Sequence, residues 1–432
     1  MRTIFFDLET SDLNTVGQIL NYAFVEIDDD WNVISSLRDN VKISPLQLPT
    51  PEAIKANKID VIEHQKISSD SEFVASKKIV SYLENIIDFN KTRLIGYNSA
   101  NFDVHYLRTT LIRNGLNPYF SGNILYGDVL HAVKKLCLTN ESFLSKMNLR
   151  ENDKPNMSLE SVCKALGLMS ERDVQQHESM SDVLLTIKLA KHLCDEYQID
   201  VRERESYEVN KRATDFDAIK IHPYTDKDGK KVSDEYCYMT LLEQNRGSSL
   251  WINLKQYEDG LDKKSVQWYN KNSSSFIVKE YVRDDSIRAR CDEARKNLSH
   301  INIQNYWPEK ACDVEQFIYM LPINEIRTLE NAIHNKDLFL LKQNKNKYAN
   351  ILYLRFLCAN IQSDEISKIA DKYLLHRYGG KMRLDKNVID SSEVEYHATY
   401  NELLSRIDDS DSLMNSLKLF YQESRVAKLL AT

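Results

Sequence analysis

Apolar residues near the start of the chain come in short continuous runs, a pattern typical of strands buried in a sheet. The first run is Thr3–Thr10 (TIFFDLET), which ends at the turn signal Ser11-Asp12. Gly17–Ile27 and Trp31–Ile43 follow as a second and a third strand, and the acidic run Asp28–Asp30 between them predicts a solvent-exposed hairpin turn. Three early strands followed by alternating helices and strands predict an α/β fold with a mixed sheet.

Helical patterns alternate with short strands further along the chain. Thr50-Pro51 is typical of a helix N-cap and first turn, and Ser69–Asn85 has amphipathic spacing. The strand Leu94-Ile95 leads through Gly96–Asp103 into a predicted helix over Val104–Arg113. A later helix is predicted from apolar residues that recur at three and four positions, namely Val183, Ile187, Ala190, Cys194 and Tyr197.

Two further helices have recognisable first turns. Asp128 precedes a helix over Val129–Leu138, and Ser158 precedes a helix that Gly167 ends. We expect both side chains to act as N-caps, because a short polar side chain at that position accepts a hydrogen bond from a free backbone N–H.

The second half of the chain changes character from about Tyr207. Short strands are predicted over Glu235–Glu243, Ser249–Leu254 and Phe276–Val282, and helices over Asn324–His334, Ile366–Tyr378 and Glu402–Ile407. A chain of 432 residues is too long for one ordinary core. We therefore predict three domains, over residues 1–200, 201–313 and 314–432.

The first strand contains two acidic residues that a buried strand should not tolerate. Asp7 and Glu9 lie two positions apart, so their carboxylates leave the same face about 6 to 7 Å apart along the strand. Two neighbouring anions repel unless a cation lies between them, and a hard divalent metal prefers carboxylate oxygens. The alternative is that Asp7 starts a turn and Glu9 is solvated, and an isolated D-x-E pattern would favour this alternative.

Other acidic residues occur at corresponding places later in the chain. Asp103 follows the strand that ends at Gly96, and Asp182 lies in the first turn of a predicted helix, near the positive end of its dipole. His177 stands five positions before Asp182 in a polar loop. A lone histidine in such a loop is usually a surface residue, but this spacing after two carboxylate segments favours a catalytic role.

In chain order these five residues, with the stretches FFDLET and GYNSANFD, resemble the DnaQ-like 3′-to-5′ exonucleases of the ribonuclease H-like fold. The similarity is to the subclass with four acidic residues and a histidine, and within it to the exonuclease I family. It covers roughly the first 200 residues with specific motifs. Beyond them it rests on length, element order and scattered residues.

The resemblance implies a fold and a mechanism. The fold is a ribonuclease H-like mixed-sheet exonuclease domain, followed by a small SH3-like β domain and an α-helical C-terminal domain. Two Mg²⁺ ions, with Mn²⁺ as a substitute, are expected at Asp7, Glu9, Asp103 and Asp182, with His177 as general base. The expected reaction is 3′-to-5′ hydrolysis of single-stranded DNA to mononucleotides.

Substrate contacts are expected beside these ligands. The resemblance implies that the Leu8 backbone and Thr10 contact the terminal 3′-hydroxyl, and Asn98 lies in the stretch that leads to Asp103. Phe102 is a candidate to stack on a base, but packing in the core is an equally good interpretation. The resemblance also implies docking to single-strand-binding protein, and we expect a monomer.

Two other functions remain open. One is a 3′-to-5′ exoribonuclease of the same fold, because the sequence gives no rule for how the site treats a 2′-hydroxyl. The other is a catalytically inactive nucleic-acid-binding protein. Such a protein would be expected to lack one or more ligands, whereas all five candidate positions are filled.

Composition adds limits to this picture. The net charge is −7, so we expect binding to phosphates to depend on a local basic groove. Lys381, Arg383 and Lys386 are candidates, although a solvated loop explains them equally well. Seven cysteines without any Cys/His cluster favour reduced thiols in the cytoplasm over a zinc site. We expect neither a signal region nor a membrane-spanning segment.

Overall fold

The computed structural model describes residues 2–86, 92–100, 102–118, 120, 124–150, 155–170, 178–203, 219–221, 237–244, 248–260, 265–270, 278–282, 284–298, 324, 327, 331, 356, 359, 363–379, 398–408 and 411–431. The chain divides into two compact units. The first contains Met1–Gly127, Gln175–Ile187 and Lys310–Thr432, and the second contains Asp128–Val174 and Lys188–Glu309.

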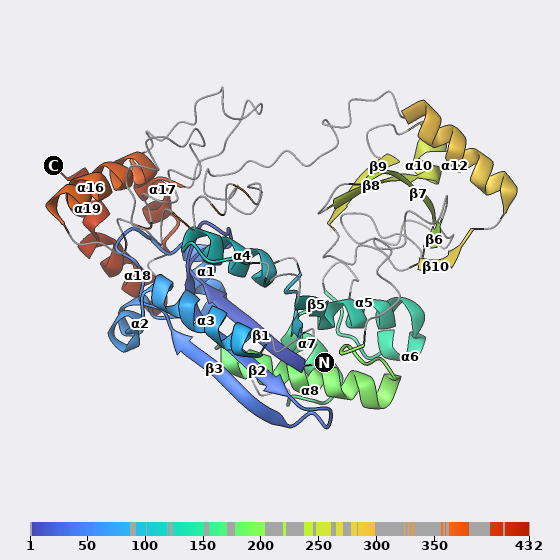
Figure 1. The fold of residues 1–432 in the computed structure, drawn as a ribbon, viewed down its shortest axis with the longest axis horizontal. Coiled ribbons are helices and arrows are strands. Elements are labelled where there is room, and N and C mark those ends of the chain that lie inside the picture. The colour runs from blue at the N-terminus through green and yellow to red at the C-terminus, as the bar shows by residue number, and fades with distance from the viewer. Residues whose placement is uncertain are drawn as a thin grey trace. The chain divides into compact units, whose positions relative to one another are not determined.

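The first unit is built on a five-stranded mixed sheet with the order β3-β2-β1-β4-β5 (Figure 1). The strands are β1 (Arg2–Thr10), β2 (Ile19–Ile27), β3 (Val33–Asn40), β4 (Thr92–Gly96) and β5 (Ile124–Asp128). Strand β1 is central, antiparallel to β2 and parallel to β4. The predicted mixed sheet and its three early strands are therefore confirmed.

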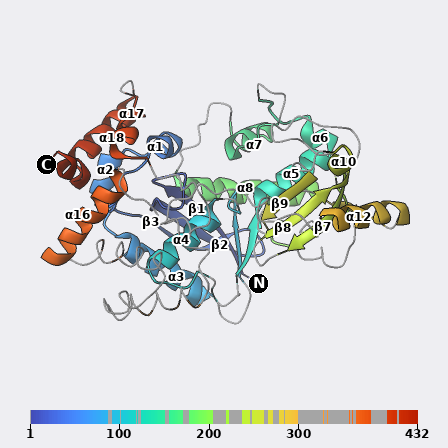
Figure 2. The same cartoon turned by 90° about the horizontal axis from the view of Figure 1, so that it is seen from above.

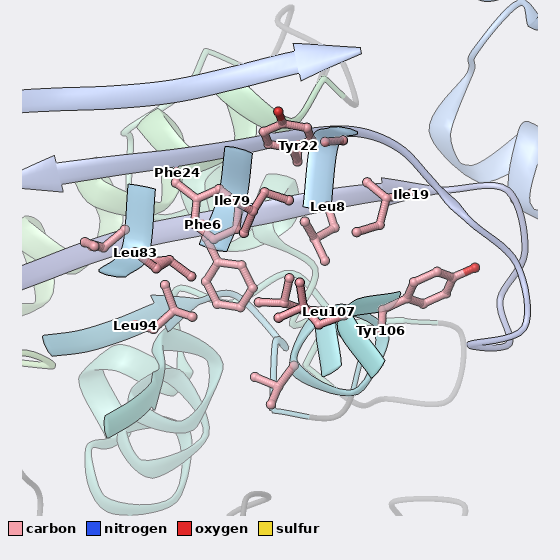
Figure 3. Packing of buried hydrophobic residues seen from close by; sticks show 14 of the residues in the cluster. Phe6, Leu8, Ile19, Tyr22, Phe24, Ile79, Leu83, Leu94, Tyr106 and Leu107 are labelled. Atoms are coloured by element: carbon pink, nitrogen blue, oxygen red, sulfur yellow. The ribbon is translucent and has the colours of Figure 1, made fainter. Parts of the chain in front are cut away.

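Helices α3 (Glu72–Ile86) and α4 (Asp103–Arg113) pack against this sheet through a buried apolar cluster (Figure 3). The sheet contributes Phe6, Leu8 and Phe24, which alternate with residues on the opposite face because successive strand side chains point to opposite faces. Members of the cluster from the two helices are Ala75, Ile79, Leu83, Val104, Tyr106, Leu107 and Leu111.

A turn and a helix cap form where the sequence predicts them. The Asp28 carboxylate accepts hydrogen bonds from the Asp30 and Asn32 amides and so closes the β2–β3 turn. The Thr50 hydroxyl accepts from the Ala53 amide and caps α1 (Pro51–Asn57). Helix α2 (Val61–Ile67), capped by Asp60, was not expected from the sequence.

The C-terminal helices of the first unit share a second core with α1 and α2 (Figure 2). They are α16 (Asp364–Tyr378), α17 (Tyr400–Ser405), α18 (Ser412–Glu423) and α19 (Arg425–Leu430). Their apolar residues pack with Leu20, Leu46 and Ile54. Two tyrosines also bind the segment before α1: the Tyr378 hydroxyl accepts from the Leu48 amide at 3.0 Å, and the Tyr421 hydroxyl donates to the Pro49 carbonyl.

The second unit contains a separate five-stranded sheet with the order β10-β6-β7-β8-β9. Its elements are β6 (Ile219–Ile221), β7 (Cys237–Gln244), β8 (Ser248–Asn253), α10 (Leu254–Glu258), β9 (Val266–Asn270), β10 (Val278–Tyr281) and α12 (Asp285–Leu298). The pairs that share hydrogen bonds are antiparallel. This sheet agrees with the predicted β-rich segment, while its SH3-like character stays a prediction.

Helices α5 (Val129–Thr139), α6 (Glu141–Leu144) and α7 (Leu159–Ala165) also belong to this unit. The Asp128 carboxylate accepts from the Leu130 amide at 3.0 Å, and the Ser158 hydroxyl accepts from the Ser161 amide. Both predicted N-caps are confirmed.

Other predictions stay open. The division at residues 200 and 313 is one of them. Most of Asn324–His334 and all of Lys381, Arg383 and Lys386 lie outside the described residues. Among the helices that the structure describes, none has the length and apolar character needed to cross a bilayer.

Candidate functional site

Strand β1 carries the first two acidic residues of the candidate site. Leu8, between them, points into the apolar cluster, so Asp7 and Glu9 leave the opposite face of the strand. Both acids are only partly exposed. The predicted side-by-side arrangement of the two carboxylates therefore holds in the structure.

The third acid, Asp103, can approach β1 because strand β4 ends before the part of β1 that carries Asp7 and Glu9. Parallel pairing of β4 with β1 ends at Phe5 and Ile95, so the strand edge beyond is open to other partners. The chain then turns, with Asn98 in the left-handed region at φ 59°, and α4 begins at Asp103. The Asp103 Oδ1 accepts a hydrogen bond from the Leu8 amide at 3.2 Å.

The fourth acid comes from α8 (Ser179–Tyr197), where Asp182 lies in the first turn as predicted. The helix begins at Ser179, three residues before Asp182. Carboxylate oxygens of Asp7, Glu9 and Asp182 all lie within 4.8 Å of one another. The two acids of β1 are thus brought together with an acid from a distant helix, and Asp103 is hydrogen-bonded to the amide of Leu8, the residue between Asp7 and Glu9.

The electrostatics of this cluster are unfavourable without a cation. Burial raises the pKa of Asp7 well above its usual value, and the charges of Asp103, Glu9 and Asp182 raise it further. Burial, with the charges of Asp182 and Asp103, raises the pKa of Glu9 from 4.5 to about 9. Each carboxylate therefore resists ionisation next to the others.

A divalent cation fits this arrangement. Carboxylate oxygens are the donors that hard cations prefer, and a bound dication would remove the repulsion that raises both pKa values. The donor set is all oxygen, with no cysteine or histidine among the three described residues whose oxygens converge. The structure thus contains an acidic cluster suited to metal binding.

His177 lies outside the described residues, so its predicted place beside the acids stays a prediction. Phe102, at the start of α4, is partly buried against the apolar cluster, with its ring centroid 5.4 Å from that of Tyr106. The packing interpretation of Phe102 therefore has direct support. Stacking on a base stays a prediction for Phe102, as does a substrate contact for Asn98.

Thr10, at the end of β1, is buried, and both its hydroxyl and its carbonyl form hydrogen bonds within the protein. Its hydroxyl donates to the Asp12 carbonyl at 2.9 Å, and its carbonyl accepts from the Asn57 side chain at 2.9 Å. The Ser11 carbonyl accepts from the Thr50 amide at 2.7 Å. Helix α1 therefore holds the backbone that follows Glu9, and a contact of Thr10 with a 3′-hydroxyl stays a prediction.

Sequence reasoning missed two residues that hold the site. Asn57 binds the Thr10 carbonyl, and Asn21 accepts from the Ser179 amide at 3.3 Å at the start of α8. Asn57 gave no local signal, because it is simply the last residue of a short helix. Asn21 did give a local signal, since it is a polar residue within a strand that is buried throughout.

Comparison with known proteins places part of this chain in a family. The exonuclease family model matches residues 4–190. Exodeoxyribonuclease I of Haemophilus influenzae is 25% identical over 309 residues, which are 68% of this chain and 57% of that relative. The chain thus spans a little over half the length of this relative.

Solved structures of exonuclease I have the same fold. The protein from Methylocaldum szegediense has a TM-score of 0.68 at 15% identity, covering 99% of each chain. The E. coli protein in complex with a dA16 oligonucleotide also has a TM-score of 0.68, at 16% identity, covering 98% of this chain and 99% of that one. An exonuclease I complex with SSB and an inhibitor has a TM-score of 0.65 at 16% identity, with the same coverage. Residues 4–190 therefore form an exonuclease-family domain, and the chain as a whole has the fold of these exonuclease I structures.

Proposed function

We propose that this chain is a 3′-to-5′ exonuclease that hydrolyses single-stranded DNA to mononucleotides. The observation that carries the proposal is the convergence of Asp7, Glu9 and Asp182 within 4.8 Å, beside Asp103, at the end of the central strand of an exonuclease I fold. A surface that only binds nucleic acid has no need to bring buried anions together at such an electrostatic cost.

Asp7, Glu9, Asp103 and Asp182 are the proposed ligands of two Mg²⁺ ions. Bound Mg²⁺ supplies positive charge at the scissile phosphate and makes a water molecule more acidic. Asp103 also fixes the Leu8 amide, which keeps the strand end between Asp7 and Glu9 rigid. His177 is proposed to take the proton of the attacking water on an imidazole nitrogen, a task suited to an ordinary histidine pKa of about 6.5.

The end of β1 is the proposed place of the 3′-terminal nucleotide. The Leu8 and Thr10 backbone, Asn98 and Phe102 are the proposed contacts. Because the Thr10 hydroxyl donates its hydrogen to the Asp12 carbonyl, it is expected to contact substrate only as an acceptor, as from a 3′-hydroxyl. The Asn57 side chain and the Thr50 amide would keep that backbone in place.

Single-stranded DNA is the proposed substrate and single-strand-binding protein the proposed partner, since related exonuclease I structures contain an oligonucleotide or SSB. The cytoplasm is the proposed compartment. The described cysteines Cys137, Cys163, Cys194 and Cys291 are free thiols, in keeping with a reducing environment.

The test compares DNA and RNA oligonucleotides of matched sequence, each blocked or free at its 3′ end, in Mg²⁺. Mononucleotide release from free-ended single-stranded DNA is expected, with little release from 3′-blocked strands. The variant Asp182→Asn should lose this activity. Degradation of RNA alone would overturn the choice of substrate, and full activity of Asp182→Asn would overturn the proposed site.

A further inference from the structure

Asn21 is a polar residue among the apolar neighbours of strand β2. It is only 7% exposed, and its partner in the β1–β2 register is Glu9. Residues directly opposite each other in an antiparallel pair point to the same face, with Cβ atoms about 4.5 to 5.5 Å apart. The Asn21 amide therefore lies beside the Glu9 side chain, on the face that carries the acids.

The same side chain holds the start of α8. Its Oδ1 accepts a hydrogen bond from the Ser179 amide at 3.3 Å, although the two residues are 158 positions apart. The first N–H groups of a helix have no acceptor within the helix, so an outside acceptor fixes where the helix begins. Asp182 lies in that first turn. One side chain thus links the strand position opposite Glu9 to the helix that carries Asp182.

A second contact at this helix start is weaker. Arg38 on β3 lies 3.9 Å from Glu178, and both side chains are well exposed to solvent. Exposed ion pairs of this kind contribute little and are screened by salt. The buried hydrogen bond of Asn21 is therefore the stronger constraint on the position of Asp182 among these two.

We propose that Asn21 is a positioning residue that sets the separation of Glu9 and Asp182 and thereby the affinity of the site for divalent metal. The inference rests on the proposed function in that it takes these acids as metal ligands. An amide suits this position because its oxygen accepts the Ser179 N–H without adding another negative charge to the cluster. Residues that orient metal ligands typically change metal affinity about 10- to 100-fold when replaced.

The test is calorimetric titration of the full chain with Mn²⁺ alone. Asn21→Leu keeps the branched shape but removes the acceptor, and it should weaken Mn²⁺ binding at least about tenfold. Asn40→Leu is the matched control, since Asn40 is the register partner of Asn21 on β3, one strand further from Glu9. It should bind Mn²⁺ as the unmodified chain does. Hydrogen exchange at the first turn of α8 should increase in Asn21→Leu and not in Asn40→Leu.

A double-mutant cycle separates positioning from general destabilisation. If Asn21 acts through Asp182, Asn21→Leu should cause no further loss of Mn²⁺ affinity in an Asp182→Asn background. An equal further loss there, or unchanged binding by the folded single variant, would overturn the inference. Should Asn21→Leu fail to fold, Asn21→Ala decides: it removes the acceptor with a smaller side chain, so the folded variant should lose Mn²⁺ affinity and α8 protection, and unchanged values of both would overturn the inference.

The outcome for Asn21 is distinguishable from the outcome for the proposed function. A chain that degrades single-stranded DNA but whose Mn²⁺ affinity is insensitive to Asn21→Leu refutes only the positioning role. A chain that binds Mn²⁺ in an Asn21-dependent way but hydrolyses no DNA refutes only the exonuclease activity.

Discussion

Burial and neighbouring charges raise the pKa values of Asp7 and Glu9, so the acidic cluster without metal opposes folding at alkaline pH. In an unfolded chain these carboxylates would be solvated, and the charges of Asp103 and Asp182 would lie far from them. The cluster is therefore retained at a cost in stability, a trade-off common where function needs closely spaced charges.

The first prediction concerns Asp7→Asn, which removes one charge with little change in volume. Hydrolysis should fall at least about 1,000-fold, because charge stabilisation by a bound metal contributes several kcal/mol. In EDTA at alkaline pH, the same variant should melt at a higher temperature than the unmodified chain, since one source of repulsion is gone. Asp195→Asn, at an exposed position of α8, is the control and should change neither quantity.

The second prediction concerns pH. The folded pKa of Glu9 is about 9 and its ordinary value is 4.5, so the folded metal-free chain holds this proton more tightly than the unfolded chain. The stabilising contribution of the protonated group is fully present below pH 4.5 and is lost as pH rises toward about 9. Thermal melts in EDTA should show this decline, and Glu9→Gln should flatten it. Saturating Mg²⁺ should reverse the trend, because the metal binds the ionised form; a pH-independent melt of the metal-free chain would contradict the raised pKa.

At the scale of elements, the turn between β4 and α4 decides where Asp103 lies. A Cβ at Gly96 would lie 2.5 Å from the Ser99 Cβ and 3.0 Å from the Phe6 carbonyl oxygen. Only a glycine lets the turn pass this close to β1.

The third prediction is that Gly96→Ala destabilises the chain by about 1 to 3 kcal/mol, the usual cost of overpacking. Metal affinity should also fall, because the shifted turn carries Asp103. Urea unfolding and Mn²⁺ titration measure the two effects. Ser99→Gly removes the nearest obstruction, so adding it to Gly96→Ala should recover part of the loss; strictly additive destabilisation would argue against the proposed clash.

At the scale of the whole molecule, the C-terminal helices are part of the unit that carries the acids. Tyr378 and Tyr421 hold the segment over Leu46–Pro49, and α1 follows this segment and binds the strand end through Asn57. The C-terminal helices and the end of β1 are thus connected through a short series of packed and hydrogen-bonded contacts.

The fourth prediction is that removing residues 314–432 abolishes cooperative thermal unfolding of the remainder. The deletion exposes apolar residues of the shared core, among them Leu46 and Ile54. A truncated chain that melts cooperatively and binds Mn²⁺ normally would instead support an independent C-terminal domain.

A milder test of the same core uses two leucines of α18. Leu417 is fully buried, whereas Leu419 is 50% exposed. Leu417→Ala should cost about 2 to 5 kcal/mol, and Leu419→Ala should stay within about 0.5 kcal/mol of the unmodified chain. Equal effects of the two substitutions would show that this helix is not anchored as described.

The sequence by itself determined four of the five strands of the first sheet, several helix caps, the shared face of Asp7 and Glu9, and the place of Asp182 in the first turn of its helix. These features depend on the alternation of side chains along a strand, the spacing of apolar residues in a helix and hydrogen bonds between near neighbours. All three are set by the order of residues within a short segment. Only the tertiary structure decided that Asn21 meets Ser179, that Asn57 meets Thr10 and that Tyr421 meets Pro49. Such contacts join residues that are far apart along the chain. Which surfaces meet therefore depends on how the whole core packs.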